Sequence, residues 1–206
     1  MYQPSHFQIT EPALLQALMA EHPLGTWVTQ RDGGFTADHI PFLYDAGRGV
    51  LLGHVARANP VWQAAGPSLV VFQGPQAYIS PSWYPGKQAH GKVVPTWNYA
   101  VVHVHGTARA FDDKPSLLAL LQRLTETHER AQAAPWSVSD APADYIDQLL
   151  GAIVGIEIAV QRIEGKWKMS QNRPAADRAG VVAALQQQGS DTACSVAEEV
   201  RARAST

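Results

Sequence analysis

The stretch YISPSWYPGKQAHGKVVPTWNY (78–99) decides how this chain is interpreted, because it is aromatic where a connecting loop is usually small and polar. Its rings form two clusters, SPSWY (80–84) and PTWNY (95–99), and nearby prolines restrict the backbone. A rigid segment that carries flat rings and hydrogen-bonding groups suits a planar ligand with polar edges. Aromatic packing beneath a long hairpin fits the same residues.

Composition limits the class of protein. The chain has 206 residues, of which 46% are hydrophobic and 17% charged, so it is large enough for one packed domain with or without a small appendage. The net charge of -2 gives no basic footprint for nucleic acid. A single cysteine, Cys194, excludes an intrachain disulfide and a Cys-based zinc site. Without a signal-peptide pattern or an apolar span, we expect a soluble, cytoplasmic protein that does not bind membranes.

Periodicity predicts a mainly β protein with helices, of the α+β class. A helix over 11–22 precedes an antiparallel meander, with a turn signal at Asp32-Gly33-Gly34. Strands are expected at 68–72 and 76–79, broken at Gly74-Pro75, and long strands at 97–111 and 152–163. We expect one domain over 1–188, ending in a helix at 175–188. We expect residues 189–206 to form a loosely attached tail, with helix as its candidate structure.

Two segments concentrate groups that bind anions. In GHVARANPVW (53–62), Arg57 ends a strand beside a helix start at Asn59, and this arrangement suits a phosphate. A surface arginine beside a helix cap is the alternative. In EGKWKMSQNRP (164–174), Lys166, Lys168 and Arg173 lie among hydrogen-bonding side chains. This segment is interpreted either as a second phosphate or ring-edge site or as the exposed end of a basic hairpin.

His103 and His105 lie two residues apart on one expected strand, so they face the same side. Such a pair suits a metal ion, but no Asp, Glu or Cys at convincing spacing completes a site. We therefore interpret both as hydrogen-bonded structural histidines and expect no metal. Walker, G-x-G-x-x-G, H-E-x-x-H and G-x-S-x-G motifs are absent from the sequence.

Taken together, GHVARANPVW (53–62), YISPSWY (78–84), VPTWNYAVVHVHG (94–106) and EGKWKMSQNRP (164–174) closely resemble the PaiB family of FMN-binding negative transcriptional regulators. TADHIPFLYD (36–45) and AIVGIEI (152–158) fit as well, so the resemblance covers residues 1 to about 186. It implies an FMN-binding split barrel, a six-stranded antiparallel Greek-key barrel flanked by helices. It also implies a homodimer with two FMN sites at the subunit interface.

The resemblance suggests how FMN is held. In split barrels the phosphate is bound by the strand end that leads into the first crossing helix, which here offers His54, Arg57 and Asn59. This set has fewer cations than is usual, so Lys87, or Lys166 and Lys168 of the partner subunit, are expected to assist.

The ring is expected against Trp83 and Trp97. Asn98 or Thr96 would then address its polar edge, and Lys168 or Arg173 would lie near N1 and the C2 carbonyl.

Three functions follow from these observations. The first is the family's own, a repressor in which FMN is a redox or ligand sensor, although DNA as a partner rests on the resemblance alone. The second is a flavin-dependent oxidoreductase that uses FMN and NAD(P)H, for which the sequence identifies no catalytic residue. The third is a haem-binding split barrel, with an axial ligand among His54, His90, His103 and His105. FMN is favoured over haem as the cofactor.

Overall fold

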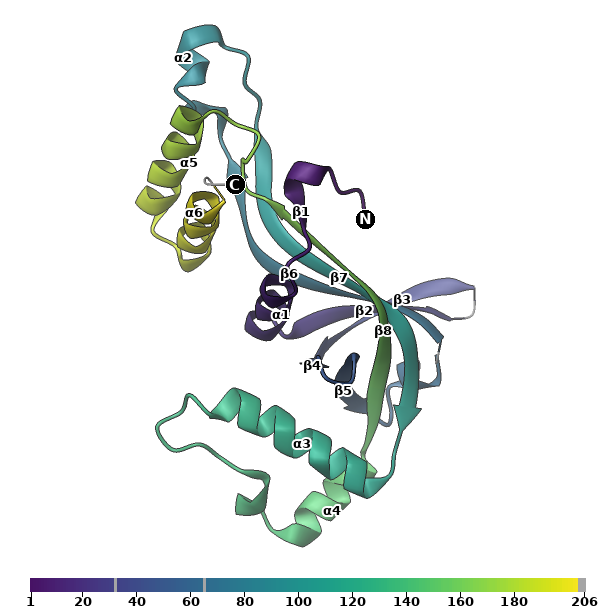
Figure 1. Ribbon diagram of the computed structural model, residues 1–206. Coiled ribbons are helices and arrows are strands. Elements are labelled where there is room, and N and C mark those ends of the chain that lie inside the picture. The colour runs from purple at the N-terminus through teal and green to yellow at the C-terminus, as the bar shows by residue number, and fades with distance from the viewer. Residues whose placement is uncertain (32, 65, 204–206) are drawn as a thin grey trace. The chain divides into compact units, whose positions relative to one another are not determined.

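The computed structural model describes residues 1–31, 33–64 and 66–203 (Figure 1). The strands are β1 (Gln8–Ile9), β2 (Leu24–Arg31), β3 (Gly34–Pro41), β4 (Leu43–Asp45), β5 (Val50–Ala56), β6 (Gly66–Ile79), β7 (Thr96–Phe111) and β8 (Ile153–Lys168). The helices are α1 (Pro12–Glu21), α2 (Gly86–His90), α3 (Lys114–Glu129), α4 (Ala143–Gly151), α5 (Ala175–Gln188) and α6 (Asp191–Ala202). In this part of the chain no helix is long and apolar enough to cross a membrane.

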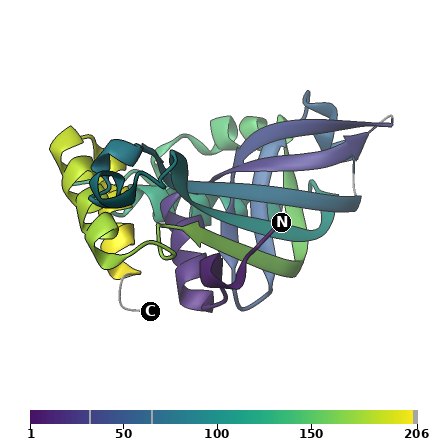
Figure 2. The ribbon, with the colours of Figure 1, turned by 90° about the horizontal axis from the view of Figure 1, so that it is seen from above.

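The strands form one antiparallel sheet in the order β3-β2-β6-β7-β8-β5-β4, with β1 paired to β8. The pairs β2–β3, β2–β6, β4–β5, β5–β8 and β1–β8 are all antiparallel, and Figure 2 shows β2 and β3 side by side. Within the described ranges, six strands have seven residues or more, namely β2, β3, β5, β6, β7 and β8, whereas β1 and β4 are short. This pattern agrees with the six-stranded antiparallel barrel that was predicted.

The chain forms two compact units. Unit 1 comprises residues 1–18, 73–103 and 164–206, and unit 2 comprises residues 19–72 and 104–163. In unit 1, α5 packs against α6 and buries Val181, Leu185 and Val196 (Figure 1). A Cβ on Gly180 would lie 2.1 Å from the Trp83 carbonyl oxygen, so only glycine permits this approach of α5 to the chain before α2.

The core of unit 2 contains a cluster of three buried aromatic rings. Phe42 meets Trp27 and Phe72 edge to face, with ring centroids 6.5 and 6.3 Å apart. The helix α3 begins where the Asp113 side chain accepts a hydrogen bond from the Ser116 N–H, at 3.0 Å. A second apolar cluster joins β5 to α3 and consists of Val50, Leu52, Leu120 and Leu124, with Leu43 and Phe111 packed against it.

The strand geometry corrects one expectation from the sequence. The expected break at Gly74-Pro75 was wrong, because β6 runs unbroken through both residues. Gly74 is needed for close packing rather than for a turn, since a Cβ there would lie 2.8 Å from the Leu18 Cδ1 atom. The turn signal at 32–34 follows β2, but Asp32 lies outside the described residues. Most of the stretch 189–206 forms α6, and the domain boundary expected at 188 stays a prediction.

Candidate functional site

The aromatic stretch 78–99 joins the end of β6 to the start of β7 through a short 3-10 helix, Pro81–Trp83, and α2. The Ser80 side chain accepts a hydrogen bond from the Ser82 N–H, and Lys87 donates to the Ser82 hydroxyl at 3.1 Å. Tyr84 is buried, whereas Trp83 is only partly exposed. Part of this stretch is therefore packing, as the alternative interpretation held.

Two rings of the stretch do reach the surface. Tyr78 at the end of β6 and Trp97 at the start of β7 are 48% and 52% exposed. Their ring centroids lie 6.1 Å apart at an interplanar angle of 72°, so they form an edge-to-face pair. This pair offers an aromatic surface to a flat ligand at the end of two neighbouring strands.

Lys168, at the end of β8, lies against the same strand end. Its Nζ donates to the Thr96 hydroxyl and, at 2.7 Å, to the Trp97 carbonyl oxygen. Burial lowers the pKa of Lys168, and the positive charges of Lys166 and Arg173 lower it further. Because both hydrogen-bond partners are neutral, the local field is positive, and an anion placed there would be stabilised.

The neighbouring cations are held by rings. Lys166 is buried and donates to the Tyr2 carbonyl oxygen at 3.0 Å, and its Nζ lies 5.5 Å from the centroid of the Tyr99 ring. The Arg173 guanidinium lies 5.1 Å from the centroid of the Tyr84 ring. Of these three cations, Lys168 is the one that donates a hydrogen bond to the exposed aromatic pair, and its partner is the main-chain carbonyl oxygen of Trp97.

Asn98 is used inside unit 1. It is buried, and its Nδ2 donates to the Ser170 hydroxyl at 3.0 Å. Ser170 has a φ of 62° and, among the residues that the structure describes, is alone in having a positive φ without being glycine. The pair joins β7 to the segment after β8, so the side chain of Asn98 is already engaged rather than open to a ring edge.

The phosphate set predicted from GHVARANPVW lies in unit 2, and two of its members have protein partners. Arg57 donates from Nε to the Gly151 carbonyl oxygen at 2.9 Å and from its Nη2 atom to the Ile153 carbonyl oxygen at 3.2 Å. The Asn59 side chain accepts from the Val61 N–H at 3.0 Å and donates to Asp38 at 2.7 Å. These contacts match the cap-and-surface alternative, and a role in holding phosphate stays a prediction.

His54 differs from its two neighbours. It lies on β5, and burial lowers its pKa, which favours the neutral imidazole. Its Nδ1 atom is buried without a hydrogen-bond partner in the described part of the chain. The structure thus places His54, Arg57 and Asn59 in unit 2. It places the other eight predicted residues in unit 1, and they are Trp83, Lys87, Thr96, Trp97, Asn98, Lys166, Lys168 and Arg173.

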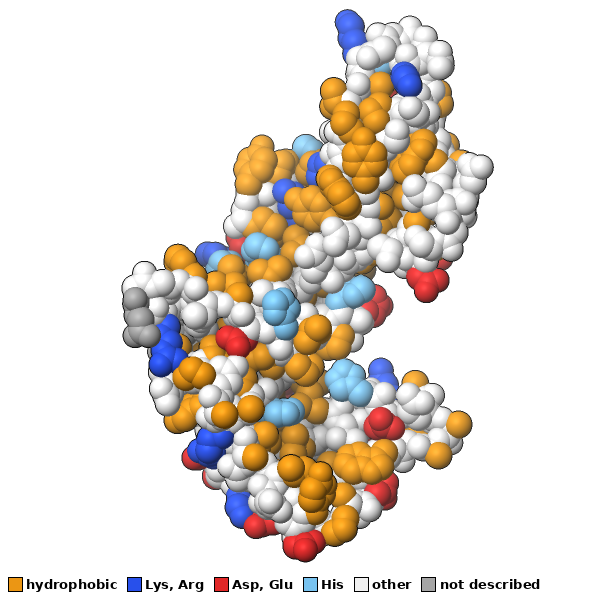
Figure 3. Space-filling model, turned by 180° about the vertical axis from the view of Figure 1, so that it is seen from behind, with side chains coloured by type: hydrophobic (Ala, Val, Ile, Leu, Met, Phe, Trp, Pro, Cys, Tyr) orange, Lys and Arg blue, Asp and Glu red, His pale blue; other side chains and the backbone are white. Residues whose placement is uncertain are grey.

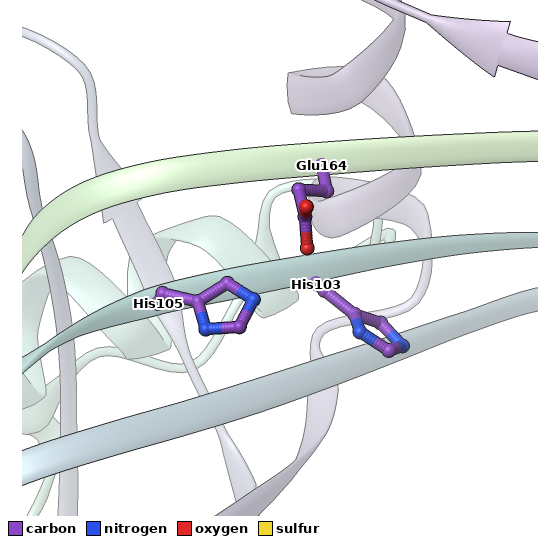
Figure 4. A group of neighbouring side chains, drawn as sticks. All are labelled: His103, His105 and Glu164. Carbon is purple, nitrogen blue, oxygen red and sulfur yellow. The ribbon is translucent and has the colours of Figure 1, made fainter. Parts of the chain in front are cut away.

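Figure 4 draws Glu164 of β8 together with His103 and His105 of β7. Spacing along the chain gave no signal for this carboxylate, because Glu164 belongs to a distant strand. Glu164 and His103 are in unit 1, whereas His105 is in unit 2. The interpretation of the two histidines as structural residues that bind no metal stays a prediction.

The chain matches known proteins over most of its length. The family model described as "Putative FMN-binding domain" matches residues 1–162. The protein named "Protease synthase and sporulation protein PAI 2" from Bacillus subtilis is 34% identical over 203 residues, which cover 96% of this chain and 95% of that protein.

Two solved structures show the same fold. One is the FAD and haem binding protein from Mycobacterium smegmatis, with a TM-score of 0.54 and 20% identity over 78% of this chain and 72% of that one. The other is a conserved hypothetical protein from Mycobacterium tuberculosis, with a TM-score of 0.60 and 12% identity over 84% of this chain and 94% of that one. The predicted split-barrel fold is confirmed.

Proposed function

We propose that this chain, which belongs to the FMN-binding domain family and has FMN as its cofactor, is a flavin-sensing negative transcriptional regulator. In this proposal FMN is held at Lys168 and the Tyr78–Trp97 pair. The observation that carries the proposal is the half-buried Lys168, which has neutral hydrogen-bond partners and further positive charge beside it and donates to the main-chain carbonyl oxygen of the exposed Trp97. FMN supplies an anionic phosphate, a flat ring and the capacity to accept a hydride or single electrons.

The residues of unit 1 fit this cofactor. An anionic group beside Lys168 would favour the charged ammonium and oppose the effect of burial on its pKa. The flat faces of Tyr78 and Trp97 provide apolar contact for a ring system, since about half of each side chain is exposed. Arg173 adds positive charge close to Lys168. Lys87, which is exposed and bonded to Ser82, is the further candidate for the phosphate.

The assembly we propose is a homodimer with an FMN site at each subunit interface. Support comes from the resemblance to the PaiB family and from the exposed rings, because half-exposed tyrosine and tryptophan are typical of interface residues. Light scattering after size exclusion measures this directly. A monomer that binds FMN would contradict the interface part of the proposal.

The regulatory role is supported by the resemblance to negative regulators. The net charge of -2 predicts that any specific DNA binding depends on a local basic surface and falls steeply with salt. A flavin oxidoreductase is the competing function, and oxidation of NAD(P)H with turnover in the presence of an acceptor would support it.

The first test is an absorption spectrum of the purified protein, recorded before and after addition of FMN and then haemin. A flavin spectrum that co-elutes with a dimer is the expected result, followed by DNA-binding and NAD(P)H assays to separate regulator from enzyme. A Soret band without flavin would favour the haem-binding alternative. The absence of any bound chromophore after titration would contradict the proposal.

A further inference from the structure

A small hollow in unit 2 is lined by arginines that the flavin proposal does not use. Its wall comes from α3, from the strands β5, β7 and β8, and from the turn before β5, and the lining residues all belong to unit 2. The hollow has a volume of about 210 Å³, which is below the range of about 300–1,000 Å³ typical of sites for drug-sized ligands. We call it the arginine pocket, after the Arg48, Arg109 and Arg123 side chains in its wall.

Two of the arginines share one buried carboxylate. Glu157 of β8 is 8% exposed, and its Oε1 atom accepts a hydrogen bond from Arg109 Nε at 2.8 Å. Its Oε2 atom accepts from Arg48. A guanidinium has five N–H donors in a planar fork, so these bonds satisfy the carboxylate but do not use all the donors of either arginine. Glu157 therefore holds two guanidiniums at the pocket while each keeps N–H groups for a ligand.

The charges around the pocket limit which anion it suits. Arg123 of α3 donates to Asp45 Oδ2 at 3.0 Å, and Asp113, which caps α3, also lines the pocket. The carboxylates of Asp45, Asp113 and Glu157 together balance the three arginines. The pocket would therefore stabilise an anion through directed N–H donors rather than through an excess of positive charge. This favours a ligand with one negative charge over a phosphate, which carries nearly two.

The remainder of the wall is largely apolar and consists of Leu52, Phe111, Ala119 and Leu120, with Ser116 beside them. Leu52 and Leu120 belong to the buried cluster that joins β5 to α3, and Phe111 packs against that cluster. Apolar side chains next to guanidinium donors match a ligand that has an apolar body and one carboxylate. The apolar contact would supply affinity, and the planar donors would orient the carboxylate.

We propose that the arginine pocket binds a small organic monocarboxylate, with its carboxylate at the guanidiniums and its apolar body against Phe111 and Ala119. None of the residues expected to hold FMN lines this pocket. The proposal therefore gives the chain a second ligand in addition to the flavin, and it stands or falls independently of the flavin contacts at Lys168.

The test is a titration of the full-length protein with benzoate, with and without FMN. Two-dimensional ¹H–¹⁵N NMR of the arginine Nε–H groups reports on the pocket directly and yields the dissociation constant. Figure 3 shows Lys and Arg side chains scattered over one face of the molecule, and such side chains bind anions weakly, so controls are needed. Benzamide offers the same ring without the charge, and sulfate offers charge without the ring.

Two substitutions separate the charge of the pocket from its shape. Arg123→Gln removes one guanidinium, and its matched control is Arg130→Gln, which removes an exposed arginine from the C-terminal end of the same helix, away from the pocket. Ala119→Leu keeps every charge and fills the hollow, and leucine is a good helix former at this exposed position. Circular dichroism and thermal unfolding establish that each variant is folded.

We expect benzoate to shift the Nε–H signals of Arg48, Arg109 and Arg123 at one site per chain. Its affinity should fall by about 10-fold in Arg123→Gln, because a charged hydrogen bond is lost, and by at least as much in Ala119→Leu, because the ring no longer fits. Arg130→Gln should leave the affinity unchanged. No shift in the wild type, equal affinity in all variants, or the same shifts with benzamide or sulfate would each overturn the proposal, whatever the flavin result.

Discussion

Replacement of Lys168 by methionine tests the cation at the centre of the proposed flavin site. Methionine keeps an unbranched apolar stem of similar length but removes the charge and the donors to Thr96 and Trp97. A hydrogen bond that involves a charged group contributes about 1.5–3 kcal/mol. Lys168 is only half buried, so the lower half of this range applies. A loss of binding free energy of that size raises the dissociation constant of FMN by about 10- to 40-fold.

The matched control for this experiment is Lys92→Met, which removes an exposed lysine of the same unit. Quenching of FMN fluorescence measures both dissociation constants, at two salt concentrations to separate local from long-range electrostatics. The midpoint potential of bound FMN then locates the contact. If Lys168 lies by N1 and the C2 carbonyl, its loss lowers the potential, whereas a phosphate contact leaves the potential unchanged. Equal affinity in the two variants would refute the assignment of Lys168.

Three further outcomes follow from particular contacts. Asn98→Leu should lower the free energy of unfolding by about 1–3 kcal/mol, because the buried Ser170 hydroxyl loses its partner. Urea unfolding measures this change, and an unchanged midpoint would show that the hydrogen bond does not contribute to stability. Gly180→Ala should destabilise the protein by about 1–3 kcal/mol through its clash with the Trp83 carbonyl, while Ala183→Ser on the exposed face of α5 should not. Arg57→Ala should lower the free energy of unfolding by about 1 kcal/mol, since the Gly151 and Ile153 carbonyl oxygens lose a hydrogen-bond donor. If Arg57 also holds the phosphate, the same substitution should weaken FMN binding. Unchanged FMN affinity would remove Arg57 from the phosphate clamp.

The pH dependence of stability provides a check on Lys168 that does not involve flavin. Burial lowers its pKa in the folded protein below the ordinary value of 10.5. Between the two pKa values the unfolded chain binds more protons than the folded one, so stability rises with pH through that window. Lys168→Met should remove this alkaline rise. A wild-type curve identical to that of the variant above neutral pH would contradict the assigned burial effect.

Much of the fold is determined by local patterns that the sequence displays. Alternation and β-branched residues predicted β7 and most of β8, and the Asp113 cap and leucine stripe predicted α3. The pattern failed at Gly74-Pro75, because a glycine needed for close packing looks the same in sequence as a glycine needed for a turn. Gly74 is needed because Leu18 packs against it, and Leu18 is distant in sequence. A pattern of neighbouring residues therefore cannot show which role the glycine has.

The site was harder to predict than the fold for a similar reason. Residue type identified the cations and rings of 78–99 and 164–174, and the structure joins these segments through Lys168, Thr96 and Trp97. Residue type did not reveal which members were already engaged. Asn98 and Tyr84 look like ligand groups in sequence, yet both are buried. Partners decide whether a polar side chain is available, and those partners come from other strands.

A strained residue lies two positions after Lys168. Ser170 adopts a left-handed backbone conformation that costs a residue other than glycine free energy, and its hydrogen bond to Asn98 offsets that cost. Gln171 fixes the same turn, because its side chain accepts from the Met169 N–H at 2.7 Å and donates to the Trp167 carbonyl oxygen at 2.6 Å. Lys168 lies between these contacts. Its ammonium is held by the Thr96 hydroxyl and the Trp97 carbonyl oxygen before any ligand arrives, which lowers the entropy cost of binding an anion there.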